Sequence, residues 1–246
     1  MSGPKKSPVL VVGVGPGLGL SIARRFGREG HPVALLSRNA HRHDSYLAEL
    51  REEGIEGLAV TADVRDTVKM RAALESVTER LGPVGVVYYG PGAADPTARP
   101  VPIPQTGVQD LRAAMGYYVD PALELVPMVL PGMLERGSGT ILFATGLAAV
   151  IPMPGLGALA LASAALRNYA LTLNEALASS GVYVGALVLG GLIRGGDIHR
   201  LALAGSADEN GFPILDPDAI AETAWTLTVE RHRPEATFNA LTSMTA

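Results

Sequence analysis

Short apolar runs alternate with longer stretches of helical pattern along this chain, and that alternation constrains its fold more than any other feature. The apolar runs are residues 8–12, 32–37, 58–62, 84–89, 140–145 and 182–189. Because they consist mostly of Val, Leu and Ile, they are typical of strands that helices cover on both faces. The sequence therefore predicts the α/β class: a doubly wound parallel sheet of about seven strands, with helices on both faces.

The segments between these runs predict helices. Their approximate ranges are 17–29, 44–53, 66–81, 106–136, 154–180 and 217–231. Three prolines within the fourth range predict that this helix is kinked or split. The chain has 246 residues, enough for one large domain, 1–246, with a full core. Residues 190–216 lack a clean period and are predicted to form an inserted substrate loop beyond the carboxyl ends of the strands, with a short helix within it as an alternative.

Composition argues against several classes of function. The formal net charge of −4 does not suit a nucleic-acid groove, which needs clustered Lys and Arg. The chain has no cysteine, which excludes disulfides and thiolate nucleophiles and is compatible with a reducing cytoplasm. Residues 137–166 carry no charge, but two prolines and five glycines interrupt them, so a buried strand, loop and helix are expected rather than a membrane span. No histidine spacing indicates a metal site, and a soluble cytoplasmic protein is expected.

The first apolar run ends in the glycine-rich sequence GVGPGLG, directly before a predicted helix. Glycines let backbone N–H groups approach a pyrophosphate, and the helix presents its positive N-terminal end to the same group. We therefore expect Gly13, Gly15, Gly17, Leu18 and Gly19 to bind a dinucleotide. A tight structural turn without a ligand is the alternative.

The second apolar run ends in Ser37-Arg38 and not in Asp or Glu. A carboxylate at this point would bind a ribose 2′-hydroxyl, whereas an arginine favours a 2′-phosphate. A charge-assisted bond of this kind is worth about 1.5–3 kcal/mol. The predicted cofactor is therefore NADP(H) in preference to NAD(H), and a solvated surface arginine is the alternative reading of Arg38.

These features resemble the short-chain dehydrogenase/reductase superfamily over nearly the whole chain. Its TGxxxGxG motif matches residues 12–19, and its acidic residue that meets the adenine matches Asp63, followed by Val64. Its NNAG segment falls on Tyr89-Gly90-Pro91-Gly92 and keeps only the last glycine. The resemblance implies a Rossmann-type fold and a nicotinamide cofactor. It also implies that Asp63, Val64, Gly90 and Gly92 help to bind that cofactor.

The same resemblance places the family's catalytic tetrad on residues of other types. The catalytic Tyr aligns with Leu159 and the Lys four residues later with Ser163, while the Ser aligns with Gly146 and the Asn with Tyr118. Leu159 cannot exchange a proton, and Ser163 carries no positive charge. All three lysines of the chain precede residue 70, so none replaces the missing one. Carbonyl reduction by the family's usual route is therefore not expected.

Four residues are candidates for a substitute acid or base: Tyr118, Thr145, Tyr89 and His199. A phenol near the nicotinamide would supply a proton, a threonine would hydrogen-bond a substrate oxygen, and a histidine titrates near neutral pH. Each also has a structural reading. The tyrosines would pack in the core or at a dimer face, the threonine would end a strand, and the histidine would lie in a solvated loop.

Three hypotheses follow from this pattern. The first is a repurposed enzyme that catalyses a non-redox step (cyclisation, isomerisation or elimination) on an apolar small molecule, with NADP(H) bound or absent. The uncharged Leu/Ala-rich start of the predicted helix at 154–180 favours it. The second is an atypical NADP(H)-dependent oxidoreductase with a substitute proton donor. The third is a pseudoenzyme: a dinucleotide sensor or partner subunit. The resemblance also implies a homodimer or homotetramer through the predicted helices 106–136 and 154–180.

Overall fold

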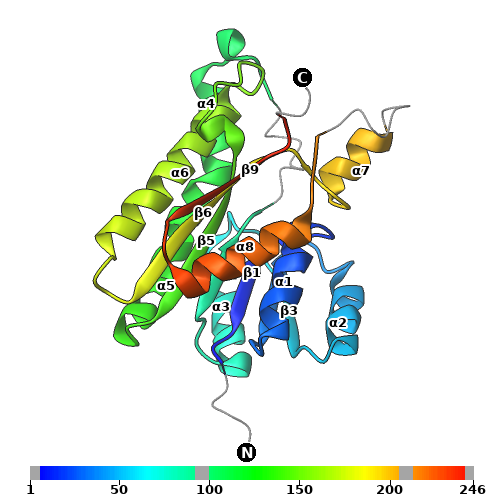
Figure 1. Ribbon diagram of the computed structural model, residues 1–246, viewed down its shortest axis with the longest axis vertical. Coiled ribbons are helices and arrows are strands. Elements are labelled where there is room, and N and C mark those ends of the chain that lie inside the picture. Colours follow the sequence, from blue (N-terminus) through cyan, green and yellow to red (C-terminus); the bar gives the residue numbers. More distant parts are fainter. Residues whose placement is uncertain (1–5, 92–99, 205–212, 242–246) are drawn as a thin grey trace, which may run out of the picture.

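A seven-stranded parallel sheet forms the centre of the fold (Figure 1), as the alternation of apolar runs predicts. The computed structural model describes residues 6–91, 100–204 and 213–241. The strand order is β3-β2-β1-β4-β5-β6-β9, and every neighbouring pair is parallel. These strands are β1 (Val9–Val12), β2 (Val33–Ser37), β3 (Gly57–Thr61), β4 (Val86–Tyr89), β5 (Gly139–Gly146), β6 (Val182–Gly190) and β9 (Glu235–Asn239).

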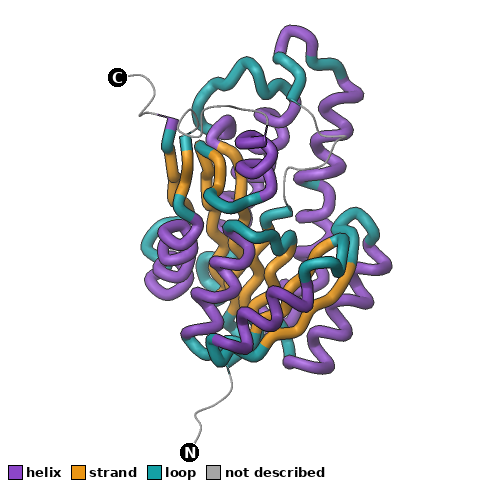
Figure 2. Tube along the Cα trace, turned by 90° about the vertical axis from the view of Figure 1, so that its right-hand side faces the viewer, coloured by secondary structure: helices purple, strands orange, loops and turns teal. Residues whose placement is uncertain are grey.

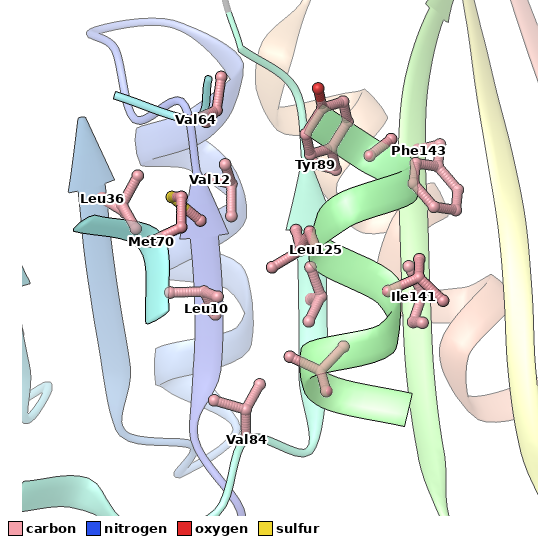
Figure 3. Close-up of a cluster of buried hydrophobic side chains, with 14 of the residues drawn as sticks. Leu10, Val12, Leu36, Val64, Met70, Val84, Tyr89, Leu125, Ile141 and Phe143 are labelled. Carbon is pink, nitrogen blue, oxygen red and sulfur yellow. The ribbon is translucent and has the colours of Figure 1, made fainter. Parts of the chain in front are cut away.

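Helices cover both faces of this sheet (Figure 2). The α-helices are α1 (Leu18–Arg28), α2 (His43–Glu52), α3 (Thr67–Leu81), α4 (Val108–Tyr118), α5 (Asp120–Glu135), α6 (Ala158–Ala176), α7 (Asp197–Ala204) and α8 (Pro217–Glu230). Helices α1, α2 and α8 pack on one face, and α3, α4, α5 and α6 pack on the other. Within β1, Leu10 and Val12 face one core while Val9 and Val11 face the other. Figure 3 shows part of the first core, where Leu125 and Ile141 lie among other fully buried side chains.

The helix predicted at 106–136 is split into α4 and α5 at Val119. Pro121 lies in the first turn of α5, where its missing N–H costs nothing, but within one continuous helix its ring would clash with the preceding turn. Pro127 and Pro131 lie inside α5 without ending it. The predicted split is therefore confirmed.

The helix predicted at 154–180 begins later, at Ala158, and ends at Ala176. Gly157 precedes it with a φ of +45°. A Cβ at this position would lie 2.0 Å from the carbonyl oxygen of Val101, so the chain can enter α6 here only through a glycine. The residues before Gly157 form a turn and not helix.

The carboxyl-terminal part of the chain holds three strands that sequence reasoning did not place, β7 (Leu192–Ile193), β8 (Ile214–Leu215) and β9. The seventh strand, β9, had no assigned range, and it pairs with the end of β6 from Ala186 to Gly190. The predicted insertion at 190–216 contains α7 and the two short strands β7 and β8, which pair in parallel. Its residues 205–212 lie outside the described part of the chain.

Candidate functional site

The turn between β1 and α1 packs tightly except at one glycine. Gly13 has a φ of +87°, and a Cβ there would lie 2.5 Å from the carbonyl oxygen of Gly90. A Cβ on Gly17 would lie 2.8 Å from Ile193, and one on Gly19 would lie 2.9 Å from Val14. Around Gly15, in contrast, no atom lies within 4 Å of the Cβ position.

Gly15 therefore leaves backbone open where a pyrophosphate would approach. The first turn of α1 contains no acidic residue, and its N-cap, Gly17, has no side chain to bind the N–H groups at the helix start. The positive end of this helix is left for an anion. Leu18 is buried and contributes to packing.

A cavity of about 160 Å³ lies beside this turn, at the carboxyl ends of the strands. Gly13, Val14 and Gly15 line one side, and Arg38 from the end of β2 lines another. Ligands of doubly wound sheets bind at this edge, so the cavity has the expected place for the adenosine half of a dinucleotide.

Asp63, expected near an adenine, is held by its neighbour Arg65. The Arg65 guanidinium makes two hydrogen bonds to the carboxylate, Nη2 to Oδ2 at 2.7 Å and Nε to Oδ1 at 3.0 Å. These bonds lower the pKa of Asp63 to about 2, and the charge of Arg38 acts in the same direction. Val64, the next residue, lines the cavity itself.

Sequence reasoning did not assign several residues to this cavity, among them Arg42, Tyr46 and Asp197. Arg42 Nη1 donates to Asp197 Oδ2 at 2.8 Å, which joins the start of α2 to the start of α7 across 155 residues of sequence. This bond lowers the pKa of Asp197. No local pattern reveals a pair so far apart in sequence.

The phenol of Tyr46 is a second missed feature. Tyr46 is 5% exposed, and its hydroxyl has no hydrogen-bond partner of normal geometry among the described residues. Burial raises the pKa of Tyr46, and the nearby Arg42 guanidinium opposes that shift. Because an unpaired buried donor is costly, this hydroxyl is suited to bind a ligand in the cavity.

Thr145, Gly146 and Ser163 lie together at the end of β5. The Thr145 hydroxyl donates to the carbonyl oxygen of Ser163 at 3.0 Å. A Cβ on Gly146 would lie 3.2 Å from Ser163 Oγ. The positions that the resemblance assigns to the family's Ser and Lys are therefore neighbours, and a backbone carbonyl accepts the Thr145 proton.

The aromatic candidates lie on the neighbouring elements. Tyr118, half-buried on α4, and Leu159, half-buried on α6, pack against the same core. Tyr89 is fully buried, and its hydroxyl donates to the carbonyl oxygen of Tyr118 at 3.2 Å. Burial raises the pKa of Tyr89 far above its ordinary value. The Tyr117 and Tyr118 rings meet edge to face, with centroids 4.9 Å apart.

His199 and the loop after β4 complete the predicted set. His199 is 9% exposed, and its Nδ1 accepts the N–H of Gly195 at 3.1 Å, which assigns the proton of the neutral ring to Nε2. It lies on α7, the helix that also carries Asp197. Gly90 contacts the glycine turn, and Gly92 lies outside the described residues.

Within the ranges described, no three side chains of His, Cys, Asp or Glu gather closely enough to hold a metal ion. The helices of these same ranges are all too short or too polar to cross a bilayer.

Comparison with known proteins gives a consistent result. Residues 7–194 match the sequence model of the short chain dehydrogenase family. The chain is 27% identical over 222 residues to an NADP-dependent 3-hydroxy acid dehydrogenase, YdfG, of Salmonella typhi, which covers 88% of this chain and 87% of that protein. It is also 26% identical over 225 residues to glycine betaine reductase ATRR of Emericella nidulans. That match covers 90% of this chain, which spans only 17% of the length of ATRR.

A solved structure has the same fold over almost its whole length. It is the apo form of a short chain oxidoreductase from Pseudomonas aeruginosa PAO1, described as containing an atypical catalytic center. The TM-score is 0.83 at 19% identity, with 98% of both chains covered.

These relatives correct the main functional expectation. A non-redox enzyme for cyclisation, isomerisation or elimination was expected from the tetrad positions, and that expectation is wrong, because the relatives are named as a reductase and a dehydrogenase. The findings favour the alternative, an NADP(H)-dependent oxidoreductase. The physical reason is that a nicotinamide cofactor carries the hydride chemistry itself, so different side chains around it do not by themselves remove redox activity.

Proposed function

The chain belongs to the short chain dehydrogenase family, and from that premise we propose that it is an NADP(H)-dependent oxidoreductase with a substitute proton donor. It would interconvert a carbonyl and a hydroxyl group on a small molecule. The observation that carries this proposal is the cavity at the carboxyl ends of the strands, where open backbone at Gly15 and the cationic side chain of Arg38 line one space.

The residues present fit an NADP(H) molecule. Gly15 and the start of α1 would hold the pyrophosphate, and Arg38 and Arg42 would hold a 2′-phosphate. The buried hydroxyl of Tyr46, which lacks a partner in the described residues, supplies a further donor in the same cavity. When bound, the nicotinamide would supply or accept the hydride.

Reduction of a carbonyl also needs a proton, and Tyr118 is the best candidate to supply it. Tyr118 stands at the position that aligns with the catalytic Asn of the family, whereas Tyr89 is fully buried and Thr145 bonds to the carbonyl oxygen of Ser163. His199 lies on α7 and accepts a backbone N–H there. Tyr118 is half-buried on α4, and this helix packs against α6, which carries Ser163. A phenol so placed would donate to the developing alkoxide, a contribution of about 10²–10⁴-fold in rate.

The decisive experiment is titration of the purified protein with NADPH and with NADH, followed by a panel of carbonyl substrates. We expect NADPH to bind more tightly, Arg38→Ala to weaken NADPH binding about tenfold, and NADPH absorbance to fall with at least one substrate. Firm NADPH binding without any turnover would contradict the proposed activity and favour a dinucleotide sensor. Binding of neither nucleotide would contradict the cofactor site itself.

A further inference from the structure

The ion pair between Arg42 and Asp197 lies inside the cavity that would bind the cofactor. We propose that Asp197 is a specificity-determining residue of this cavity, because it competes with the 2′-phosphate of NADP(H) for Arg42. Arg42 exchanges one anionic partner for another, so Asp197 limits how strongly the protein prefers NADP(H) over NAD(H). This inference rests on the proposed function.

The pair has the properties of an exchangeable contact. Arg42 Nη1 and Asp197 Oδ2 are 2.8 Å apart, and the two side chains are 35% and 40% exposed. Exposed pairs of this kind shift an equilibrium by a factor of about five at most, because water screens them. A phosphate dianion, with more charge and three acceptor oxygens, is the stronger partner for a guanidinium.

The charges that line the cavity point to the same exchange. Its lining includes Arg38, His41 and Arg42, and Asp197 is the single acidic side chain among the described residues that line it. A 2′-phosphate in this space would meet two guanidinium groups and one carboxylate. Without that carboxylate, the side chains that line this space in the described part of the chain would all be neutral or cationic.

Tyr46 gives an independent sign that this part of the cavity takes a ligand. Its hydroxyl is buried and, in the described residues, has no hydrogen-bond partner. Nearby polar side chains are satisfied, since the Ser37 hydroxyl and His43 Nε2 lie 2.7 Å apart. Tyr46 lines the cavity together with Arg42, so a phosphate oxygen held by Arg42 would also be placed to accept the phenol proton.

The test uses two probes that differ only in the phosphate in question: adenosine 2′,5′-bisphosphate and adenosine 5′-monophosphate. Neither contains nicotinamide, so calorimetric binding to them is independent of catalysis. We expect Asp197→Asn to lower the Kd of the bisphosphate about two- to fivefold and to leave the Kd of the monophosphate unchanged. Tyr46→Phe should raise the Kd of the bisphosphate by a similar factor and leave the Kd of the monophosphate unchanged.

A matched control removes the same charge elsewhere. Asp218 is also an exposed aspartate in the first turn of a helix, α8, and it does not line the cavity. Asp218→Asn should change neither affinity. In an Arg42→Ala background, the fold-increase in bisphosphate affinity caused by Asp197→Asn should fall to about one. Asp197 and the phosphate would then have no Arg42 guanidinium to compete for.

The outcomes separate this inference from the proposed function. If the wild type binds NADPH and Arg38→Ala weakens it, but Asp197→Asn leaves the bisphosphate affinity unchanged, the inference is overturned and the proposed cofactor stands. An equal gain with and without Arg42 also overturns it, because Asp197 would then act only as a repulsive charge. If wild-type protein binds neither NADPH nor the bisphosphate, the proposed function fails.

Discussion

Gly13 and Gly15 are two residues apart in the same turn, yet a Cβ would clash with neighbouring backbone at Gly13 and would meet no atom at Gly15. At Gly13 the backbone of the loop after β4 fills the space that a Cβ would take, whereas at Gly15 that space is open. The sequence pattern indicates both glycines equally. Only their surroundings separate a glycine needed for folding from one that is free to serve a ligand.

This difference gives a paired prediction. Gly13→Ala should lower the free energy of unfolding by more than about 1–2 kcal/mol, since both the left-handed φ and the contact with Gly90 oppose a Cβ. Gly15→Ala should fold with nearly unchanged stability but bind NADPH more weakly. Urea unfolding and calorimetric titration of both variants would check this. Full NADPH affinity in Gly15→Ala would contradict the role assigned to that backbone.

The two aromatic candidates allow a matched test of the proton donor. Tyr118→Phe should lower kcat by about 10²-fold or more without changing the Kd of NADPH, because only the proton is lost. Tyr89→Phe removes a hydroxyl of the same kind from a fully buried side chain, where it bonds to the carbonyl oxygen of Tyr118. It should cost about 1 kcal/mol of stability and leave kcat nearly unchanged. The reverse pattern in steady-state kinetics would make Tyr89 the donor.

Residue by residue, the site was only partly predictable. The glycine turn and Arg38 follow from local pattern, because the chain geometry after a strand fixes where they point. Arg42 and Asp197 are 155 residues apart, and their pairing depends on how α7 returns to the sheet. In the sequence, Tyr46 looks like an ordinary core tyrosine. Only the structure shows that its buried hydroxyl has no hydrogen-bond partner among the described residues.

Among the elements, those with strong local signals were predicted well. Six apolar runs became strands within one or two residues, and the prolines correctly indicated the break between α4 and α5. The start of α6 was missed because it depends on Gly157 contacting a distant carbonyl. β9 was missed because its sequence, EATFN, is half polar and gains its strand structure from pairing with β6.

The turn between β3 and α3 carries a prediction about pH. The pKa of Asp63 is lowered from 3.8 to about 2 by Arg65, so its ion pair stabilises the fold fully above about pH 4. That stability should be lost as the pH falls towards 2. Because both side chains are partly exposed, the amount should be about 1 kcal/mol or less.

Urea unfolding of wild type and Asp63→Asn at several acidic pH values would measure this. The wild type should lose more stability than the variant between about pH 4 and pH 2, since the variant has no carboxylate to protonate. Parallel pH profiles for the two proteins would show that the Asp63 ion pair contributes nothing.

At the scale of the whole molecule, one helical layer exposes large apolar side chains to solvent, which is unfavourable. Leu123 and Leu134 on α5 are each 43% exposed, and Leu161 on α6 is 45% exposed. These helices form one side of the molecule (Figure 1). Large apolar side chains left exposed on one helical layer favour an interface there. We propose that a second copy of this chain covers them, in a homodimer or homotetramer.

Light scattering coupled to size-exclusion chromatography would test this assembly. The wild type should have the mass of two or four chains, and Leu123→Glu or Leu161→Glu should reduce it to one, because a buried glutamate at an interface is costly. Val68→Glu is the control, since Val68 is 79% exposed on α3 and lies outside this pair of helices. A monomeric wild type would refute the proposal.

The short ladder between β7 and β8 has a consequence for how this protein can change over evolutionary time. Leu192 N donates to Pro213 O at 2.8 Å and Arg194 N to Leu215 O at 3.0 Å, so both ends of the segment between them are tied together. The entropy of closing a loop depends only weakly on its length. Lengthening or exchanging this segment should therefore leave the central sheet undisturbed. Because Asp197 lies in it, such a change would also alter the cavity that Asp197 and Arg42 line, so the affinity of that cavity can evolve without any change in the strands.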